Sequence, residues 1–285
     1  MHVRSPAAHA AAERLGEVEA LSADPVASAV RNVLGTGAVK DALSGVPSGH
    51  PIHPALTDLA IGSWTSATIL DLVGGEGSQQ AADKLVAVGL LSTVPVIATG
   101  MSDWADTIGP ERRIGTAHAL TNAAATACYA ASLAARRSGR RGTGVLLGLA
   151  GASIAGAGAW LGGHLAFSRG VGVDETTFER PPEDWTAVAR AEELVEGRPK
   201  AVRAGGVEAV LVRRGGRVHA LADRCNHRGG SLADGELQGD CLVCPLHGSV
   251  FALEDGSVER GPATAPQPVY EVRERDGTVE LRAAG

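Results

Sequence analysis

The sequence has little of what a disulfide-stabilised or a nucleic-acid-binding protein needs. Only four cysteines occur in 285 residues, which excludes a disulfide scaffold. The formal net charge of −6 gives no electrostatic support for binding to phosphate backbones, so we expect no nucleic-acid partner. The composition also excludes a disordered or collagen-like chain.

Charged residues are scarce in the middle of the chain. Only 14 occur among the 115 residues from Pro54 to Ser168, against 44 among the other 170. A long stretch so poor in charge is typical of a segment whose surroundings are not water. The distribution therefore argues against a wholly soluble protein.

Four apolar stretches follow one another in this region, each near the ~20 residues that span a bilayer. They cover residues 55–73, 85–101, 114–135 and 144–167. Short polar breaks separate them, and short connections favour antiparallel neighbours. The last stretch carries Gly144/Gly148 and Gly158/Gly162 at the GxxxG spacing that lets helices approach closely. We expect an all-α four-helix transmembrane bundle, with a buried helix pair in a soluble protein as the alternative.

The remainder divides by composition. We expect a helical N-terminal tail (1–49), the four-span membrane domain (50–168), a charged linker (169–183) and an all-β domain (184–285). Acidic residues interrupt the first 40 residues, so no cleavable signal peptide is expected. Alternating apolar residues and turn signals predict strands at 207–212, 217–221, 270–275 and 278–282.

Two short motifs in the C-terminal region carry the candidate chemistry. They are Cys225-Asn226-His227-Arg228-Gly229 and Cys244-Pro245-Leu246-His247-Gly248, a Cys-x-His and a Cys-x-x-His with 16 residues between them. Two thiolates and two imidazoles are donors that can hold an iron centre. Zinc is the competing metal, because two cysteines and two histidines also hold it tetrahedrally. Cys241 forms a Cys-x-x-Cys with Cys244, but no βαβ pattern supports a thioredoxin-like motif.

The two motifs closely resemble those of Rieske [2Fe–2S] domains, and the resemblance runs from about residue 184 to the end. It implies a [2Fe–2S] cluster, with Cys225 and Cys244 on the inner iron and His227 and His247 on the outer iron. Four further residues are implied to surround the cluster. Gly229 and Gly248 give tight turns, Ser249 supplies a hydrogen bond to the cluster, and Pro262 lies in a covering loop.

Departures from the Rieske pattern indicate the subtype. The cytochrome bc type has a disulfide between its cluster loops, but the matching positions here are Gly230 and Leu246. The high-potential type also has a tyrosine where this chain has Phe251. Because hydrogen bonds to sulfur raise the potential, we expect an intermediate value within the Rieske range of roughly −150 to +300 mV. Too few residues follow Phe251 for an oxygenase domain, so we expect neither a self-contained oxygenase nor a catalytic residue.

The segment Gly49-His50-Pro51-Ile52-His53-Pro54, with the later His118 and Asn122, resembles a bacterial four-span membrane domain that is sometimes fused to a Rieske domain. The resemblance implies topology but no chemistry. With four antiparallel spans, one end of the bundle collects polar side chains, among them His53, Asp58, His118, Asn122 and His164. Such groups at membrane depth are costly. We expect either interfacial residues satisfied by water and headgroups, or a quinone or haem pocket.

These features predict a multi-pass protein of the bacterial inner membrane that transfers single electrons. The expected partners are membrane lipid and either a redox partner protein, such as a separate oxygenase or reductase, or the quinone pool. The alternative is a redox-sensing or structural module without turnover. The arginine-rich loop at 136–141 favours the cytoplasm for the end opposite the β-domain. The missing disulfide and unpaired Cys241 favour a reducing compartment for the β-domain itself, and we expect it in the cytoplasm.

Overall fold

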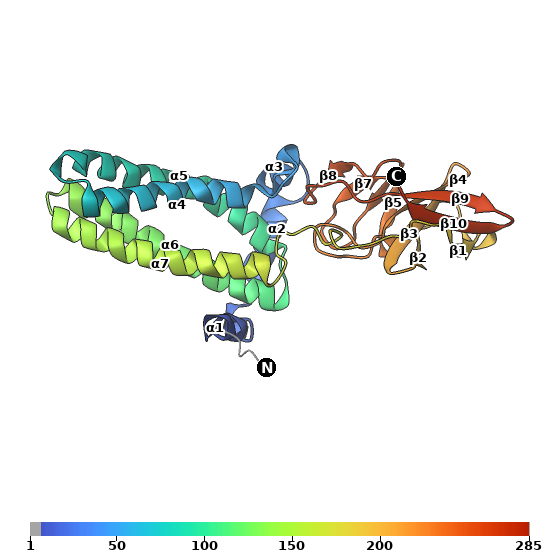
Figure 1. Cartoon of the computed structure of the whole chain (residues 1–285), viewed down its shortest axis with the longest axis horizontal. Helices are drawn as coiled ribbons and strands as arrows, with labels where there is room; N and C mark the ends of the chain where they lie inside the picture. Colours follow the sequence, from blue (N-terminus) through green and yellow to red (C-terminus); the bar gives the residue numbers. More distant parts are fainter. Residues whose placement is uncertain (1–6, 285) are drawn as a thin grey trace. The chain divides into compact units, whose positions relative to one another are not determined.

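The computed structural model describes residues 7–284, which fall into two compact units (Figure 1). The helical unit comprises residues 7–33 and 52–171, and the β unit comprises residues 34–51 and 172–284. A stretch upstream of the long helices thus belongs to the unit that contains the C-terminal strands. The predicted boundaries of tail, membrane domain and linker stay predictions.

The N-terminal part is helical, as predicted. Its α-helices within the described residues are α1 (Ala7–Leu15), α2 (Asp24–Leu34), α3 (Ala38–Ser44), α4 (Ile52–Val73), α5 (Gln79–Ala105), α6 (Gly109–Arg137) and α7 (Arg141–Phe167). The four long helices coincide with the four apolar stretches of the sequence. They lie side by side in Figure 1, where α4 packs mainly on α5 and α6 mainly on α7.

Two of these helices, rather than the expected four, are candidate membrane spans. In the part of the chain that the structure describes, α5 (counted from Glu76) and α7 are long and apolar enough to cross a membrane. The expectation of four spans is not met by α4 and α6. The reason is composition, because α4 includes Asp58 and Asp71, and α6 has charged ends and a polar interior that includes His118 and Asn122.

Glycines bring α6 and α7 into close contact. A Cβ atom added to Gly158 would lie 2.5 Å from Asn122 Oδ1, and one added to Gly162 would lie 3.0 Å from His118 Cε1. Any larger residue would push the two helices apart at these points. The GxxxG spacing in the sequence thus marks a real helix–helix contact.

Buried ion pairs join all four long helices. The Arg136 side chain of α6 is only 1% exposed and bonds Ser132 Oγ through Nε at 3.1 Å. Its guanidinium reaches Asp83 Oδ1 of α5 at 2.9 Å and both carboxylate oxygens of Asp71 of α4. Arg141 of α7 pairs with the same two aspartates at 2.7 and 3.0 Å. This network fixes the four helices at one end of the helical unit.

The C-terminal part is all-β, as predicted. Its strands are β1 (Thr186–Arg190), β2 (Lys200–Ala204), β3 (Val207–Arg214), β4 (Arg217–Ala222), β5 (Glu236–Gln238), β6 (Cys241–Val243), β7 (Val250–Ala252), β8 (Val258–Arg260), β9 (Tyr270–Arg275) and β10 (Thr278–Ala283). They form three antiparallel sheets with strand orders β1-β10-β9, β2-β3-β4 and β5-β6-β7-β8. All four strands predicted from the sequence are present.

A hydrophobic core built from residues of β3, β4, β6 and β7 supports the two motifs. Its fully buried members include Leu242, Phe251 and Leu232, and Cys225 and Cys244 belong to the same cluster. The two cysteines are therefore anchored by the packing of the domain and are kept away from water.

Candidate metal centre

Two loops of the β unit bring the predicted ligands together. Loop 1 (residues 223–231) follows β4 and carries Cys225 and His227, and loop 2 (residues 244–249) joins β6 to β7 and carries Cys244 and His247. The cysteines are 1% and 2% exposed, are not joined by a disulfide, and are hydrogen-bonded thiol to thiol. The two half-buried imidazole rings lie 5.1 Å apart between centroids, at 83° to each other. Two sulfur and two nitrogen donors thus converge from two loops.

The two loops have the same backbone hydrogen bonds. In each, the cysteine N–H donates 2.8 Å to the carbonyl five residues later. The backbone N–H of the glycine four residues after the cysteine donates back to the cysteine carbonyl, at 2.8 Å for Gly229 and 3.0 Å for Gly248. Both glycines have positive φ, +70° and +77°, a region that residues with a Cβ rarely adopt. The sequence prediction that these glycines make tight turns is consistent with this geometry.

The same backbone turn in both loops directs backbone N–H groups at the sulfurs. Each cysteine sulfur accepts hydrogen bonds from the backbone N–H groups two and three residues later. These belong to His227 and Arg228 in loop 1 and to Leu246 and His247 in loop 2. Amides in this position favour the thiolate form, which is the form that binds metal.

Two of the four donors, Cys244 and His227, have pKa values shifted toward the form that binds metal. The hydrogen bond from Cys225 lowers the pKa of Cys244, while the same contact and burial raise the pKa of Cys225. Burial, with the nearby His247, Arg228 and Lys40, holds the pKa of His227 well below its usual value. One acidic thiol and a neutral imidazole are suited to a metal, since these ligands bind when deprotonated. The donor set, two buried sulfurs and two imidazoles, fits a [2Fe–2S] group with mixed ligation.

The loops also meet at Gly230 and Leu246. A Cβ atom on Gly230 would lie 3.0 Å from Leu246 Cβ and 3.3 Å from Cys244 Sγ. These are the two positions at which the cytochrome bc type has its disulfide, and here they face each other without sulfur. Leu246 is 43% exposed, so an apolar side chain stands at the surface beside His247.

Ser249 and the Pro262 loop are in contact. Ser249 is fully buried, and its Oγ accepts a hydrogen bond of 3.0 Å from the Ala263 N–H. Ser249 thereby ties loop 2 to the loop that contains Pro262, which follows β8. The neighbouring Phe251 is fully buried in the core and offers no hydroxyl.

Asn226 and Gln267 hold loop 1 in place and were not predicted. The Asn226 side chain donates to the Ala265 carbonyl at 2.7 Å, and its backbone N–H donates to Gln267 Oε1 at 3.1 Å. Gln267, 45 residues from β4, returns hydrogen bonds to the carbonyls of Ala222 and Arg224 at 2.9 and 2.7 Å. The only sequence signal was the position of Asn226 inside the first motif, between Cys225 and His227.

A segment far upstream, residues 34–51, also contacts the centre. Asp41 Oδ1 of α3 accepts a hydrogen bond of 2.9 Å from the Gly261 N–H, in the Pro262 loop. A Cβ atom on Gly248 would lie 3.4 Å from Thr36 Cγ2. The buried Lys40 is close enough to His227 to affect its pKa. This segment therefore forms part of the surroundings of the centre.

Comparisons with known proteins agree with this geometry. A family model described as "Rieske [2Fe-2S] domain" matches residues 184–271. The ferredoxin CarAc of Metapseudomonas resinovorans is 34% identical over 96 residues, which are 33% of this chain and 90% of that protein. The chain belongs to the Rieske [2Fe–2S] family. Its cofactor is a [2Fe–2S] cluster.

Other proteins are also similar to parts of the chain. The anthranilate 1,2-dioxygenase ferredoxin subunit of Burkholderia cepacia is 32% identical over 98 residues, covering 34% of this chain and 91% of that protein. A solved structure, the ferredoxin of carbazole 1,9a-dioxygenase from Nocardioides aromaticivorans, is 26% identical, covers 36% of this chain and all of that one, and has a TM-score of 0.34. A second family model, "Predicted membrane protein (DUF2231)", matches residues 49–175. The chain thus joins a Rieske domain to a domain of a predicted membrane family.

The structure brings three of the five polar residues expected at one end of the bundle, His53, His118 and Asn122, close to one another. His53 Nδ1 lies 3.1 Å from the Val96 carbonyl, His118 Nδ1 lies 2.9 Å from the Gly158 carbonyl, and the two imidazoles interact electrostatically. Asn122 stands one turn after His118, and its amide nitrogen lies 3.3 Å from the His118 ring. Asp58, on α4, is exposed. His164 instead contacts Glu13 of α1, which no sequence pattern indicated.

Replacing Ser249 with alanine is expected to lower the reduction potential by tens of millivolts while the iron content stays unchanged. The Ser249 Oγ accepts from Ala263, which leaves its proton to be donated, and loss of a donor near sulfur disfavours the reduced state. An EPR-monitored redox titration measures the shift. Ser257→Ala, in the turn before β8, is the control, and an equal potential in all three proteins would contradict the assigned hydrogen bond.

Replacing Asp41 with alanine is expected to loosen residues 34–51 from the Pro262 loop, because it removes the acceptor of the Gly261 N–H. Hydrogen exchange at Gly261 should accelerate about 10-fold, which corresponds to one lost hydrogen bond of ~1.4 kcal/mol. Asp41→Asn keeps an acceptor oxygen and should exchange nearly as slowly as the wild type. If Gly261 exchanged as slowly in the alanine variant as in the wild type, the Asp41 contact would not hold residues 34–51 to the Pro262 loop.

Proposed function

We propose that the chain is a membrane-anchored Rieske protein that transfers single electrons. Cys225 and Cys244 would bind one iron of the cluster and His227 and His247 the other. The observation that carries this proposal is the convergence of these four donors from two loops with the same backbone hydrogen bonds. A [2Fe–2S] cluster exchanges one electron at a time. The protein holds the sulfurs in a dry core and keeps the imidazoles at the edge, where a partner can approach.

The surface of the helical unit supports insertion into a membrane. Large apolar side chains are exposed along its long helices, including Leu72 on α4, Leu91 and Ile97 on α5 and Leu146 on α7. Such a surface is costly in water and favourable in lipid. We propose that α4 and α6 cross the bilayer together with α5 and α7, shielded by them and by the buried pairing of Arg136 with Asp71. The expected location is the bacterial inner membrane, with the Rieske domain in the cytoplasm.

The electron partner is proposed to be a protein of the oxygenase or reductase class. Two relatives are named as ferredoxins, one of them the ferredoxin subunit of anthranilate 1,2-dioxygenase. Leu246 offers an exposed apolar contact beside His247, where a partner's surface would come nearest to the outer iron. Replacing Leu246 with glutamate should therefore slow electron exchange with such a partner and leave the EPR spectrum unchanged.

The test of electron transfer uses membranes that contain the whole chain. After addition of NADH to feed the respiratory chain, or of a purified oxygenase reductase with NADH, EPR follows the redox state of the cluster. We expect reduction within seconds and reoxidation when air, or the oxidised partner, is admitted. A cluster that stays in one state with every donor would contradict electron transfer and would favour the sensing module. Resistance of the chain to carbonate extraction tests its membrane insertion.

Quinone or haem binding in the helical unit is a second candidate function. His53 places Nδ1 against a backbone carbonyl, which leaves Nε2 as the nitrogen available to a quinone oxygen or a haem iron. The neighbouring His118 has Nδ1 against the Gly158 carbonyl and Nε2 3.3 Å from the Asn122 amide nitrogen, so it would support the site rather than bind the group. The measurement is the quinone and haem content of the purified chain. His53→Ala should remove the bound group, whereas His50→Ala, which removes an exposed histidine, should retain it. Equal content in both variants, or none in the wild type, would exclude the site.

A further inference from the structure

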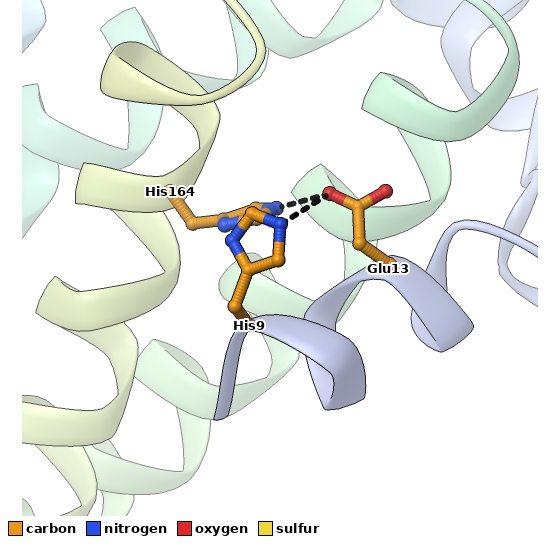
Figure 2. A group of neighbouring side chains, drawn as sticks. All are labelled: His9, Glu13 and His164. Carbon is orange, nitrogen blue, oxygen red and sulfur yellow. Dashed lines mark hydrogen bonds and ion pairs between the residues drawn. The ribbon is translucent and has the colours of Figure 1, made fainter. Parts of the chain in front are cut away.

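Three side chains converge where α1 packs against the end of α7 (Figure 2). His9 and Glu13 lie one turn apart on α1, and His164 lies in the last turn of α7. One nitrogen of each imidazole and one oxygen of Glu13 all lie within 4.8 Å of one another. Glu13 Oε1 is 3.0 Å from His164 Nε2 and 3.8 Å from His9 Nε2. Figure 2 shows both rings turned toward this oxygen.

We propose that His9, Glu13 and His164 bind a divalent transition-metal ion of the zinc type. Two imidazoles and one carboxylate are donors that zinc prefers. In a tetrahedral zinc site with bonds of ~2.0–2.1 Å, neighbouring ligand atoms lie ~3.3 Å apart. The two measured separations, 3.0 and 3.8 Å, lie on either side of this value. Three protein ligands leave the fourth position for water, as in open zinc sites.

The surroundings orient the three ligands. Arg169 pairs with the other Glu13 oxygen, Oε2, and with Glu111 at 3.3 Å, so that Oε1 is left to face the histidines. The Trp160 ring stacks on His164 at 5.5 Å and 20°. Partners that fix the orientation of metal ligands in this way are typical of functional metal sites.

The charge of the site also suits a cation. Burial raises the pKa of Glu13, but Arg169 and the hydrogen bond with His164 outweigh burial and leave this pKa below its usual value. The carboxylate is therefore ionised at neutral pH. The site does not use the Rieske loops, so it is independent of the function proposed for the cluster. An ion here would join the N-terminal helix α1 to α7.

The experiment measures zinc binding by the purified full chain in detergent. The protein is treated with EDTA, shown to retain two iron atoms per chain, and dialysed against Zn²⁺, and bound zinc is measured by mass spectrometry. Iron retention excludes binding of zinc to an empty cluster site. We expect one zinc per wild-type chain and a rise in the unfolding temperature of the helices when zinc is added.

The variants decide the outcome. His9→Ala and Glu13→Gln should each weaken zinc binding at least ~100-fold and abolish the thermal shift. The His9 side chain is 39% exposed, so its removal should not unfold the helical unit. His50→Ala, which removes an exposed histidine elsewhere, should bind zinc like the wild type. No zinc on the wild type, or equal zinc on wild type and His9→Ala, would show that the three residues form only a hydrogen-bonded group.

Discussion

Cys244→Ser is expected to yield a chain without iron and without the EPR signal of a [2Fe–2S] cluster. The inner iron would lose a soft thiolate, and serine supplies a hydroxyl of much higher pKa in a core that is closed to water. Cys225→Ser should have the same effect, because the two loops present their sulfurs equally. Iron content and the EPR spectrum of the reduced protein measure the loss.

Cys241→Ala is the matched control for these variants. Cys241 lies three residues before Cys244, in β6, and burial raises the pKa of its thiol, which keeps it protonated. Its removal should change neither the iron content nor the spectrum. If the Cys241 variant lost its iron while a His247→Ala variant kept a wild-type spectrum, the ligand assignment would be wrong, and a site built on Cys241 and Cys244 would replace it.

Arg136→Ala is expected to destabilise the helical unit by about 3–5 kcal/mol, the usual cost of removing one partner from a buried ion pair. The change leaves Asp71, which is almost fully buried, without its bidentate partner and also removes the link to Asp83. Arg141 alone would remain to balance two carboxylates. Denaturant unfolding of the detergent-solubilised chain, followed by helical circular dichroism, measures the change.

Arg137→Ala is the control for this prediction, since the neighbouring residue is exposed and of the same charge. It should change the free energy of unfolding by less than ~0.5 kcal/mol. A double variant, Arg136→Met with Asp71→Asn, should recover part of the loss because it leaves no unpaired buried charge. Equal stability of the Arg136 and Arg137 variants would show that the network does not hold the four helices together.

The parts of the molecule that follow from local sequence were predictable. Cys225 and His227 are two residues apart, and each loop turns at its own glycine, so the motifs indicated both the donors and the turns. The strands of the β9–β10 hairpin were likewise predicted, because the turn residues Asp276-Gly277 lie between two segments in which apolar and polar residues alternate.

Contacts between residues distant in sequence were not predictable. Asp41 meets Gly261 across 220 positions, and Glu13 meets His164 across 151, and neither pair has a local signal. The contact of His164 with Glu13 was therefore not anticipated. Hydropathy marks α5 and α7 but not α4 and α6 as candidate spans among the described residues, for a related reason. A helix that presents polar residues to its neighbours has the length of a span but not its mean hydropathy.

Pulsed EPR of the reduced, purified chain tests the central claim most directly. Two histidines on one iron should give magnetic couplings from two directly bound nitrogens. Metal analysis of the same protein should find two iron atoms per chain and no stoichiometric zinc. His227→Ala and His247→Ala should each lose the coupling of one nitrogen, or the cluster itself. A cluster without nitrogen couplings, or a protein that holds zinc in place of iron, would contradict the assignment of Cys225, His227, Cys244 and His247 as its ligands.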